Sequence, residues 1–221
     1  MDKESKAVIT EPSFKGKHST LLRIWHWSTF IIILGSLVTV LFAKTLFNAK
    51  DNTLPVQQNL QKSNITVSPD QARSVAHDFN DLIWHWHIYV GYVLAGLLLF
   101  RILLEFFQPK QQKLVSLLKN ALKYLRIPGT NKQNAKHFLW VKYLYLIFYF
   151  SLFVQACTGL FMVYSDDVPG LKNIRHTAKD IHNIFMWIII SYIVIHISGV
   201  ILAELGKKYK GIVSDMINGG E

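Results

Sequence analysis

The stretch IHNIFMWIIISYIVIHISGVILAEL, residues 181–205, decides the fold of this chain. It is almost wholly apolar, and at about 1.5 Å per residue a helix of this length crosses about 30 Å of hydrocarbon. Two histidines, His182 and His196, stand in it fourteen residues apart. Fourteen residues return a helix almost to the same face, so both imidazoles look into one seam, about 21 Å apart along the axis. The stretch predicts a membrane-spanning helix with a histidine near each side of the bilayer.

Three further apolar blocks have similar length, and apolar residues make up 51% of the 221 residues. The four predicted spans are 21–43, 83–107, 137–164 and 181–205. We predict an all-α integral membrane four-helix bundle over 21–205, preceded by a segment 1–20 and followed by a tail 206–221. The first block follows a polar segment and lacks a persuasive small-residue cleavage site, so we expect it to be retained.

The net charge of +10 is unevenly distributed along the chain. Lysines and arginines concentrate in 1–20, 108–136 and 206–221, whereas aspartates balance them in 44–82 and 165–180. By the positive-inside rule, both termini are predicted to be cytoplasmic and the other two loops to face outward. The charge therefore indicates membrane topology and not nucleic-acid binding. We expect a multi-pass protein of the bacterial inner membrane.

Two segments outside the spans carry further predictions. In 110–126, leucines and Ala121 recur at helical spacing with lysines between them, which is typical of an amphipathic helix on the inner leaflet. A solvated helix or a partner-docking surface is the alternative. The 44–82 stretch is predicted to be a long polar loop that ends in a helical segment, 68–81, and could contact an external partner.

The predicted topology sorts the intramembrane histidines into two levels. His26 and His196 fall toward the cytoplasm, and His182 falls toward the outside with either His85 or His87. Two imidazoles from facing helices can clamp an iron porphyrin and leave no open coordination site. We therefore predict two bis-histidine haems b. Histidines hydrogen-bonded across helices are the alternative, whereas a zinc site would require about four converging ligands.

His85 and His87 point in nearly opposite directions on a helix, so only one can serve the outer haem. Gly91 lies one turn after His87 and would leave a flat place for a porphyrin, and Gly199 stands three residues after His196. We predict His87 as the ligand, with the reverse assignment left open.

Haem propionates need cationic partners at the membrane edge, and Arg23 and Arg101 are the candidates. Snorkelling to lipid phosphates is the alternative for both, and Arg101 can also pair with Glu105 four residues on. The remaining histidines are predicted to lie on the surface, although His176 could reach a propionate.

Several motifs together resemble the bacterial cytochrome b561 and Ni,Fe-hydrogenase b-type cytochrome subunit family. They are Trp25-His26-Trp27, His87 with Gly91-Tyr92, QACTG at 155–159, HNIFMW at 182–187 with His196, and GIVSDMINGG at 211–220. The resemblance implies a diheme membrane cytochrome with His26 and His196 on one iron and His87 and His182 on the other. It also implies similarity to the membrane anchors of hydrogenases and formate dehydrogenases, which pass electrons between a periplasmic iron–sulfur subunit and quinone.

We therefore predict electron transfer across the membrane between a periplasmic redox partner and the quinone pool, as a subunit of an oxidoreductase complex and not as a stand-alone enzyme. One alternative is a stand-alone quinone-linked oxidoreductase that uses a small donor such as superoxide. An alternative of another class is a small transporter or proton-conducting bundle without haem. Lipid and quinone are expected partners, and homo-oligomerisation is left open.

Overall fold

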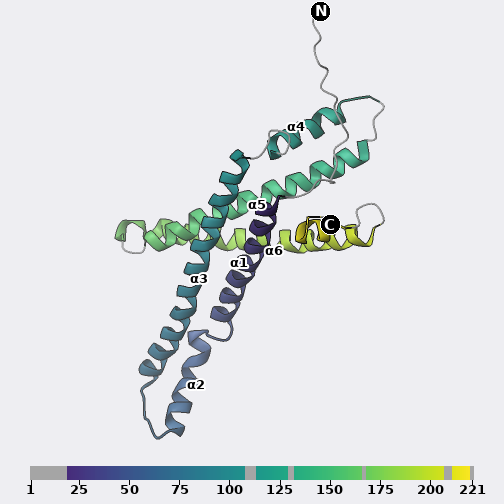
Figure 1. The fold of residues 1–221 in the computed structure, drawn as a ribbon. Helices are drawn as coiled ribbons and strands as arrows, with labels where there is room; N and C mark the ends of the chain where they lie inside the picture. The colour runs from purple at the N-terminus through teal and green to yellow at the C-terminus, as the bar shows by residue number, and fades with distance from the viewer. Residues whose placement is uncertain (1–18, 108–112, 129–131, 166–167, 207–210, 220–221) are drawn as a thin grey trace, which may run out of the picture. The chain divides into compact units, whose positions relative to one another are not determined.

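The computed structural model describes residues 19–107, 113–128, 132–165, 168–206 and 211–219. Throughout this part of the chain the structure is helical, without strands, which confirms the predicted all-α class. In chain order the helices are α1 (Thr20–Lys44), α2 (Ala49–Lys62), α3 (Pro69–Phe107), α4 (Leu114–Leu125), α5 (Lys132–Tyr164), the short 3₁₀ helix η1 (Pro169–Leu171), α6 (Lys172–Leu205) and α7 (Ile212–Ile217), as Figure 1 shows.

Helices α1, α3, α5 and α6 are each long and apolar enough to cross a membrane. Each contains one of the four predicted spans. Only 6% to 17% of the residues in their most apolar windows are buried by the described protein, as expected for helices surrounded by lipid. The chain is a helical, multi-pass membrane protein.

Helix α3 begins fourteen residues before its predicted span because a capping box starts it at Ser68. The Ser68 hydroxyl accepts from Gln71 N at 3.2 Å, and the Gln71 side chain accepts from Ser68 N at 2.8 Å. Pro69 then occupies the first helical position, where a missing N–H costs nothing. The helical 68–81 segment is thus continuous with the second span.

The predicted 44–82 loop contains a helix that was not expected from the sequence. Helix α2 is polar and has Pro55 in its interior, so it gives neither a span signal nor a clear apolar stripe. Asn48 caps its start by accepting from Lys50 N at 3.0 Å. Asn80 of α3 donates to the carbonyl oxygens of Ala43 and Phe47, each at 2.8 Å, and so fastens the turn before α2.

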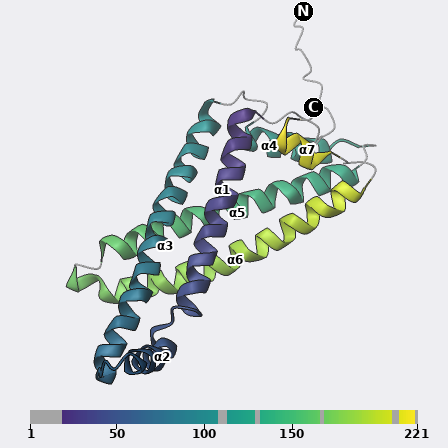
Figure 2. The ribbon, with the colours of Figure 1, turned by 60° about the horizontal axis from the view of Figure 1, so that its bottom comes forward.

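The chain divides into two compact units whose segments alternate along the sequence. One comprises Met1–Ile24, Leu98–Gln155 and Ile181–Glu221, and the other comprises Trp25–Leu97 and Ala156–Asp180. In the second unit α1 and α3 run antiparallel and side by side (Figures 1 and 2). Trp25 is 5% exposed and its Nε1 donates to Leu97 O at 2.8 Å, which joins the two helices at one end of this unit.

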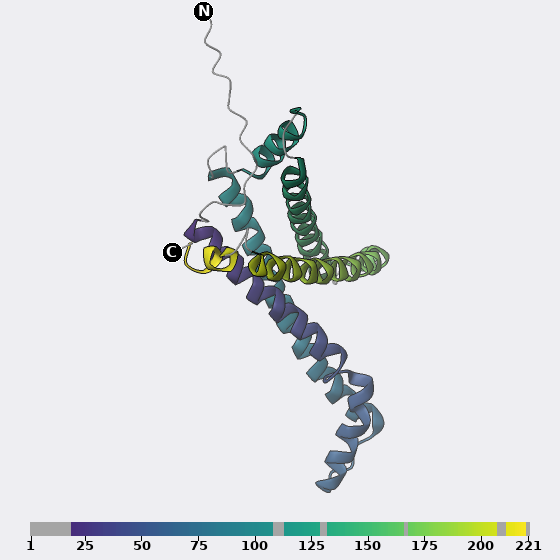
Figure 3. The same cartoon turned by 90° about the vertical axis from the view of Figure 1, so that its right-hand side faces the viewer.

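In the first unit α4 folds back on the start of α5, as Figure 3 shows. Ala121 of α4 is fully buried against Phe138 and Leu139 of α5, with Leu117 and Leu118 packed around them. Part of the apolar face predicted to lie on a leaflet therefore packs on α5, while Leu122 of the same face is 42% exposed. Positions 110–112 of that predicted segment lie outside the described residues.

The long helices α5 and α6 form an antiparallel pair in the first unit. The rings of Phe148 and Tyr192 stack with centroids 4.4 Å apart, and Phe150 meets Phe185 edge-on at 5.9 Å.

After α6, Gly211 N donates to the Glu204 carboxylate at 3.1 Å, which turns the chain into α7. Helix α7 lies beside the first turn of α1 (Figure 3).

Candidate cofactor site

His182 and His196 lie on one stripe of the unbroken helix α6. Both are half-buried, and Ile189 between them is 5% exposed, whereas Trp187 and Ile195 on other faces are 59% and 51% exposed. Buried or half-buried positions follow this stripe at spacings of three and four residues: 182, 185, 186, 189, 192, 193 and 196. Both imidazoles therefore belong to the protein-facing side of the helix, about 21 Å apart along its axis.

The ring of His196 belongs to an aromatic stack. It lies nearly parallel to Tyr192, with an interplanar angle of 8° and centroids 5.7 Å apart. Tyr192 stacks in turn on Phe148 of α5. These contacts restrict the rotation of the His196 ring, and a metal ligand with a restricted ring is already oriented before the metal binds.

His87 is held by a hydroxyl pair on the neighbouring helix α1. Its Nδ1 lies 3.0 Å from Thr39 Oγ1 and 3.5 Å from Ser36 Oγ. The Thr39 hydroxyl donates its own proton to Ser36 O at 2.7 Å, so towards His87 it can only accept. His87 is therefore assigned as the tautomer that carries its proton on Nδ1, which places the lone pair on Nε2, where a metal ligand needs it.

His85 has a different environment. Its side chain is exposed, and its Nδ1 donates to the carbonyl oxygen of Asp81, one turn earlier on the same helix, at 2.8 Å. His87 is half-buried and hydrogen-bonded across to α1. These contacts favour His87 over His85 as the ligand on this helix.

His26 lies half-buried on α1 between two tryptophans that face different ways. Trp25 is buried and bonded to α3, whereas Trp27 is 39% exposed and contacts the His26 ring edge-on at 5.5 Å. His26 and His87 belong to the second unit, and His182 and His196 to the first.

The two predicted haem-facing glycines have room beside them. A Cβ atom built on Gly91 or Gly199 would meet nothing within 4 Å. The flat open places fit a porphyrin face, and the Nδ1-protonated His87 fits an iron ligand. Gly35 and Gly96 are equally open, so openness alone does not single out the predicted pair.

The two predicted propionate arginines have protein partners. Arg101 pairs with Glu105 at 3.0 Å and donates from Nε to Tyr149 Oη at 3.2 Å, so the alternative local pair is present. Arg23 donates from Nη1 to Ile217 O at 3.0 Å and from Nη2 to Thr20 Oγ1 at 3.2 Å. His176 pairs with Asp180 at 3.2 Å on an exposed turn of α6.

A protein-family comparison matches residues 17–219 to the model for prokaryotic cytochrome b561. The chain belongs to the prokaryotic cytochrome b561 family. Comparisons with curated proteins and with solved structures give no match. The match covers every described helix, so this cytochrome is a membrane b-type cytochrome that carries a b-type haem and transfers electrons across a membrane.

The residues that support the candidate ligands were not predicted from the sequence of the cytochrome. Thr39 and Ser36 are polar residues three apart in an apolar span, and that pattern could have marked a face of α1 that hydrogen-bonds to another helix. Lys142, a charge inside the third span, had no predicted role. Both signals are intramembrane polar groups, which mark function by default.

Proposed function

We propose that this cytochrome binds two haems b at different depths and passes electrons between them, with His26 and His196 as the ligands of one iron and His87 and His182 as the ligands of the other. Three observations support this assignment. The chain matches the family over nearly its whole length. Both histidines of α6 share its protein-facing stripe. His87 has the tautomer that suits an iron ligand.

Each haem would supply a one-electron iron couple, and the chain supplies the ligands and their surroundings. Two histidines would hold each iron, and a haem held in this way would supply electron transfer and not oxygen binding. Thr39 orients His87, and the stack of Tyr192 on Phe148 orients His196.

For the cellular role, we propose that electrons pass between a periplasmic redox subunit and the quinone pool of the bacterial inner membrane, with both chain termini in the cytoplasm. The distribution of lysines and arginines supports this orientation. Helix α2, which follows α1, offers a structured surface for such a partner on the outer side. Membership in a cytochrome family favours this role over that of a transporter.

The observation that carries the proposal is the shared face of His182 and His196 on α6. We would purify the protein in detergent and count haems per chain by the pyridine haemochromogen assay. We expect two haems in the wild-type protein and one in His182→Ala and in His196→Ala, each variant losing a different spectral component. His85→Ala is the matched control and should retain both. Full haem content in both ligand variants would refute the assignment.

A further inference from the structure

Lys142 of α5 is an intramembrane cation for which the proposed function has no use. It lies five residues inside the third predicted span. Its Nζ sits 5.2 Å from the ring centroid of Phe138 and 5.0 Å from that of Tyr145. In the described part of the chain no carboxylate lies within ion-pair distance of it. Cation–π contacts stabilise an ammonium group only modestly.

The direction of the Lys142 side chain does not fit simple snorkelling. A lysine that stretches towards the membrane surface from α5 would extend along the helix towards its nearer end, here the N-terminus. The Nζ instead contacts rings on both sides of its own position, Phe138 one turn before and Tyr145 one turn after. The ammonium group is therefore held across the helix at its own level.

The charges around Lys142 do not balance. Its charged neighbours are Arg101 and Glu105. The Glu105 carboxylate is already engaged, since it pairs with Arg101 at 3.0 Å and accepts from Leu114 N at 2.7 Å. Two cations thus stand against one carboxylate. An excess positive charge at membrane depth is costly, and an anion placed beside Lys142 would remove that cost.

Lys142 lies at the level of His196 in the antiparallel pair of α5 and α6. The contact between Phe148 and Tyr192 sets the register of the pair. Lys142 lies six residues before Phe148 on α5, and His196 lies four residues after Tyr192 on α6. Because the two helices are antiparallel, both residues lie towards the same end of the pair. At about 1.5 Å per residue, the two levels differ by only about 3 Å.

We propose that Lys142 binds a propionate carboxylate of the haem whose iron is held by His196. The inference rests on the proposed function, because it needs that haem. Lys142 would contact the edge of that haem and would not replace either of its histidine ligands. The site supplies an ammonium donor between two rings, beside an Arg101 guanidinium that is already committed to Glu105 and Tyr149. A carboxylate here would complete the charge balance of the cluster.

The test is a spectroelectrochemical titration of the purified cytochrome. Lys142→Met removes the charge and leaves an unbranched side chain one atom shorter, and Lys142→Arg keeps the charge. We expect Lys142→Met to retain two haems and to show a lower midpoint potential for one of them, because a nearby positive charge favours the reduced, more negative haem. The shifted component should be the one lost in His196→Ala, and Lys142→Arg should restore most of the shift.

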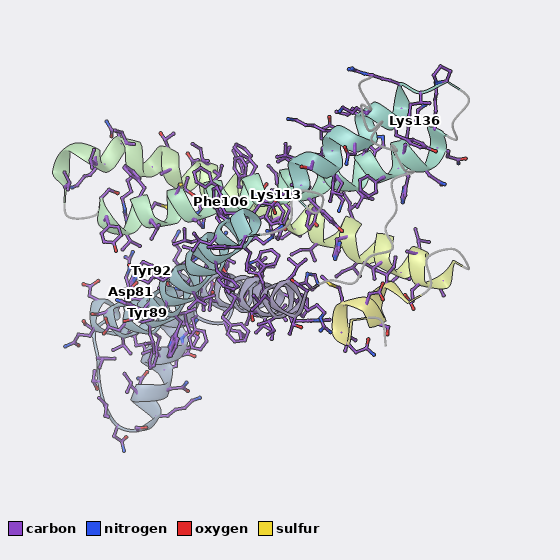
Figure 4. The ribbon with its side chains drawn as sticks, turned by 45° about the horizontal axis from the view of Figure 1, so that its top comes forward. Asp81, Tyr89, Tyr92, Phe106, Lys113 and Lys136 are labelled. Carbon is purple, nitrogen blue, oxygen red and sulfur yellow. The ribbon has the colours of Figure 1, made fainter. Side chains whose placement is uncertain are left out.

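The matched control is Lys136→Met, which removes an exposed lysine from the same helix (Figure 4) and should leave both potentials unchanged. Unchanged potentials in Lys142→Met, or a shift confined to the haem that His196→Ala retains, would overturn the proposal.

Loss of co-purified phospholipid phosphorus with unchanged potentials would assign the site to a lipid headgroup instead. If the Lys142→Met protein does not fold with its haems, the same titration of Lys142→Gln tests whether the midpoint potential falls. If His196→Ala keeps two haems, the ligand assignment itself has failed.

Discussion

Thr39 of α1 accepts a hydrogen bond from Nδ1 of His87 of α3 at 3.0 Å, across forty-eight residues of sequence. The donation of the Thr39 proton to Ser36 O decides which nitrogen of the imidazole carries hydrogen. One hydroxyl therefore determines both the orientation and the tautomer of a proposed iron ligand. Such partners are conventional supports of metal-binding histidines.

The first prediction concerns that hydroxyl. Thr39→Val keeps the shape of the side chain and removes the closer of the two hydroxyl oxygens beside His87 Nδ1. We expect the affinity for the haem on His87 to fall by about 10- to 100-fold, the usual effect of losing a support of this kind. Competition of bound haem with apomyoglobin would measure the loss. Thr45→Val is the control, because the Thr45 hydroxyl, just after the end of α1, donates to Leu41 O at 2.6 Å and not to a histidine.

The second prediction distinguishes the two histidines of α3. His87→Ala should release one haem, whereas His85→Ala should retain both, because His85 is exposed and bonded within its own helix. Absorption spectra of the reduced proteins, together with the haem count, would measure the difference. Loss of haem in His85→Ala with retention in His87→Ala would reverse the assignment on this helix.

The third prediction concerns the joint between α1 and α3. Trp25→Phe removes the hydrogen bond from Nε1 to Leu97 O and should cost about 1 kcal/mol of stability, the typical net value of one hydrogen bond, plus the effect of the smaller ring. The midpoint temperature of haem release should fall accordingly. Trp27→Phe, at a position 39% exposed, should change it much less. Equal effects at the two positions would contradict the structure.

The fourth prediction concerns the C-terminal segment. Gly219 has φ +85, and a Cβ there would lie 3.3 Å from Arg23 Nη1. Gly211 has φ +97 but would meet nothing within 4 Å. Alanine at either position costs about 1 kcal/mol of backbone strain, and at 219 it also crowds the arginine that binds Ile217 O.

We therefore expect limited proteolysis to remove the C-terminal segment faster in Gly219→Ala than in Gly211→Ala. Arg23→Gln should show the same acceleration, because it weakens the attachment from the other side. If the three variants resist protease as the wild type does, the attachment of α7 to α1 does not hold the segment.

The sequence by itself determined the membrane class, the four spans and the shared face of His182 and His196. These features are local: hydrocarbon thickness sets the length of a span, and the helical repeat sets which residues share a face. The capping box at Ser68 is local as well, and it agrees with the predicted helical segment that it begins.

Only the tertiary structure decided which partners these side chains meet. Thr39 reaches His87, Tyr149 reaches Arg101, and Ala121 of α4 packs on α5 because the helices pair in a particular register. That register depends on ridges and grooves summed over whole helices, which no local repeat records. Helix α2 escaped prediction for the same reason: it is polar, and it is anchored through Asn80 of another helix, which fastens the turn before it.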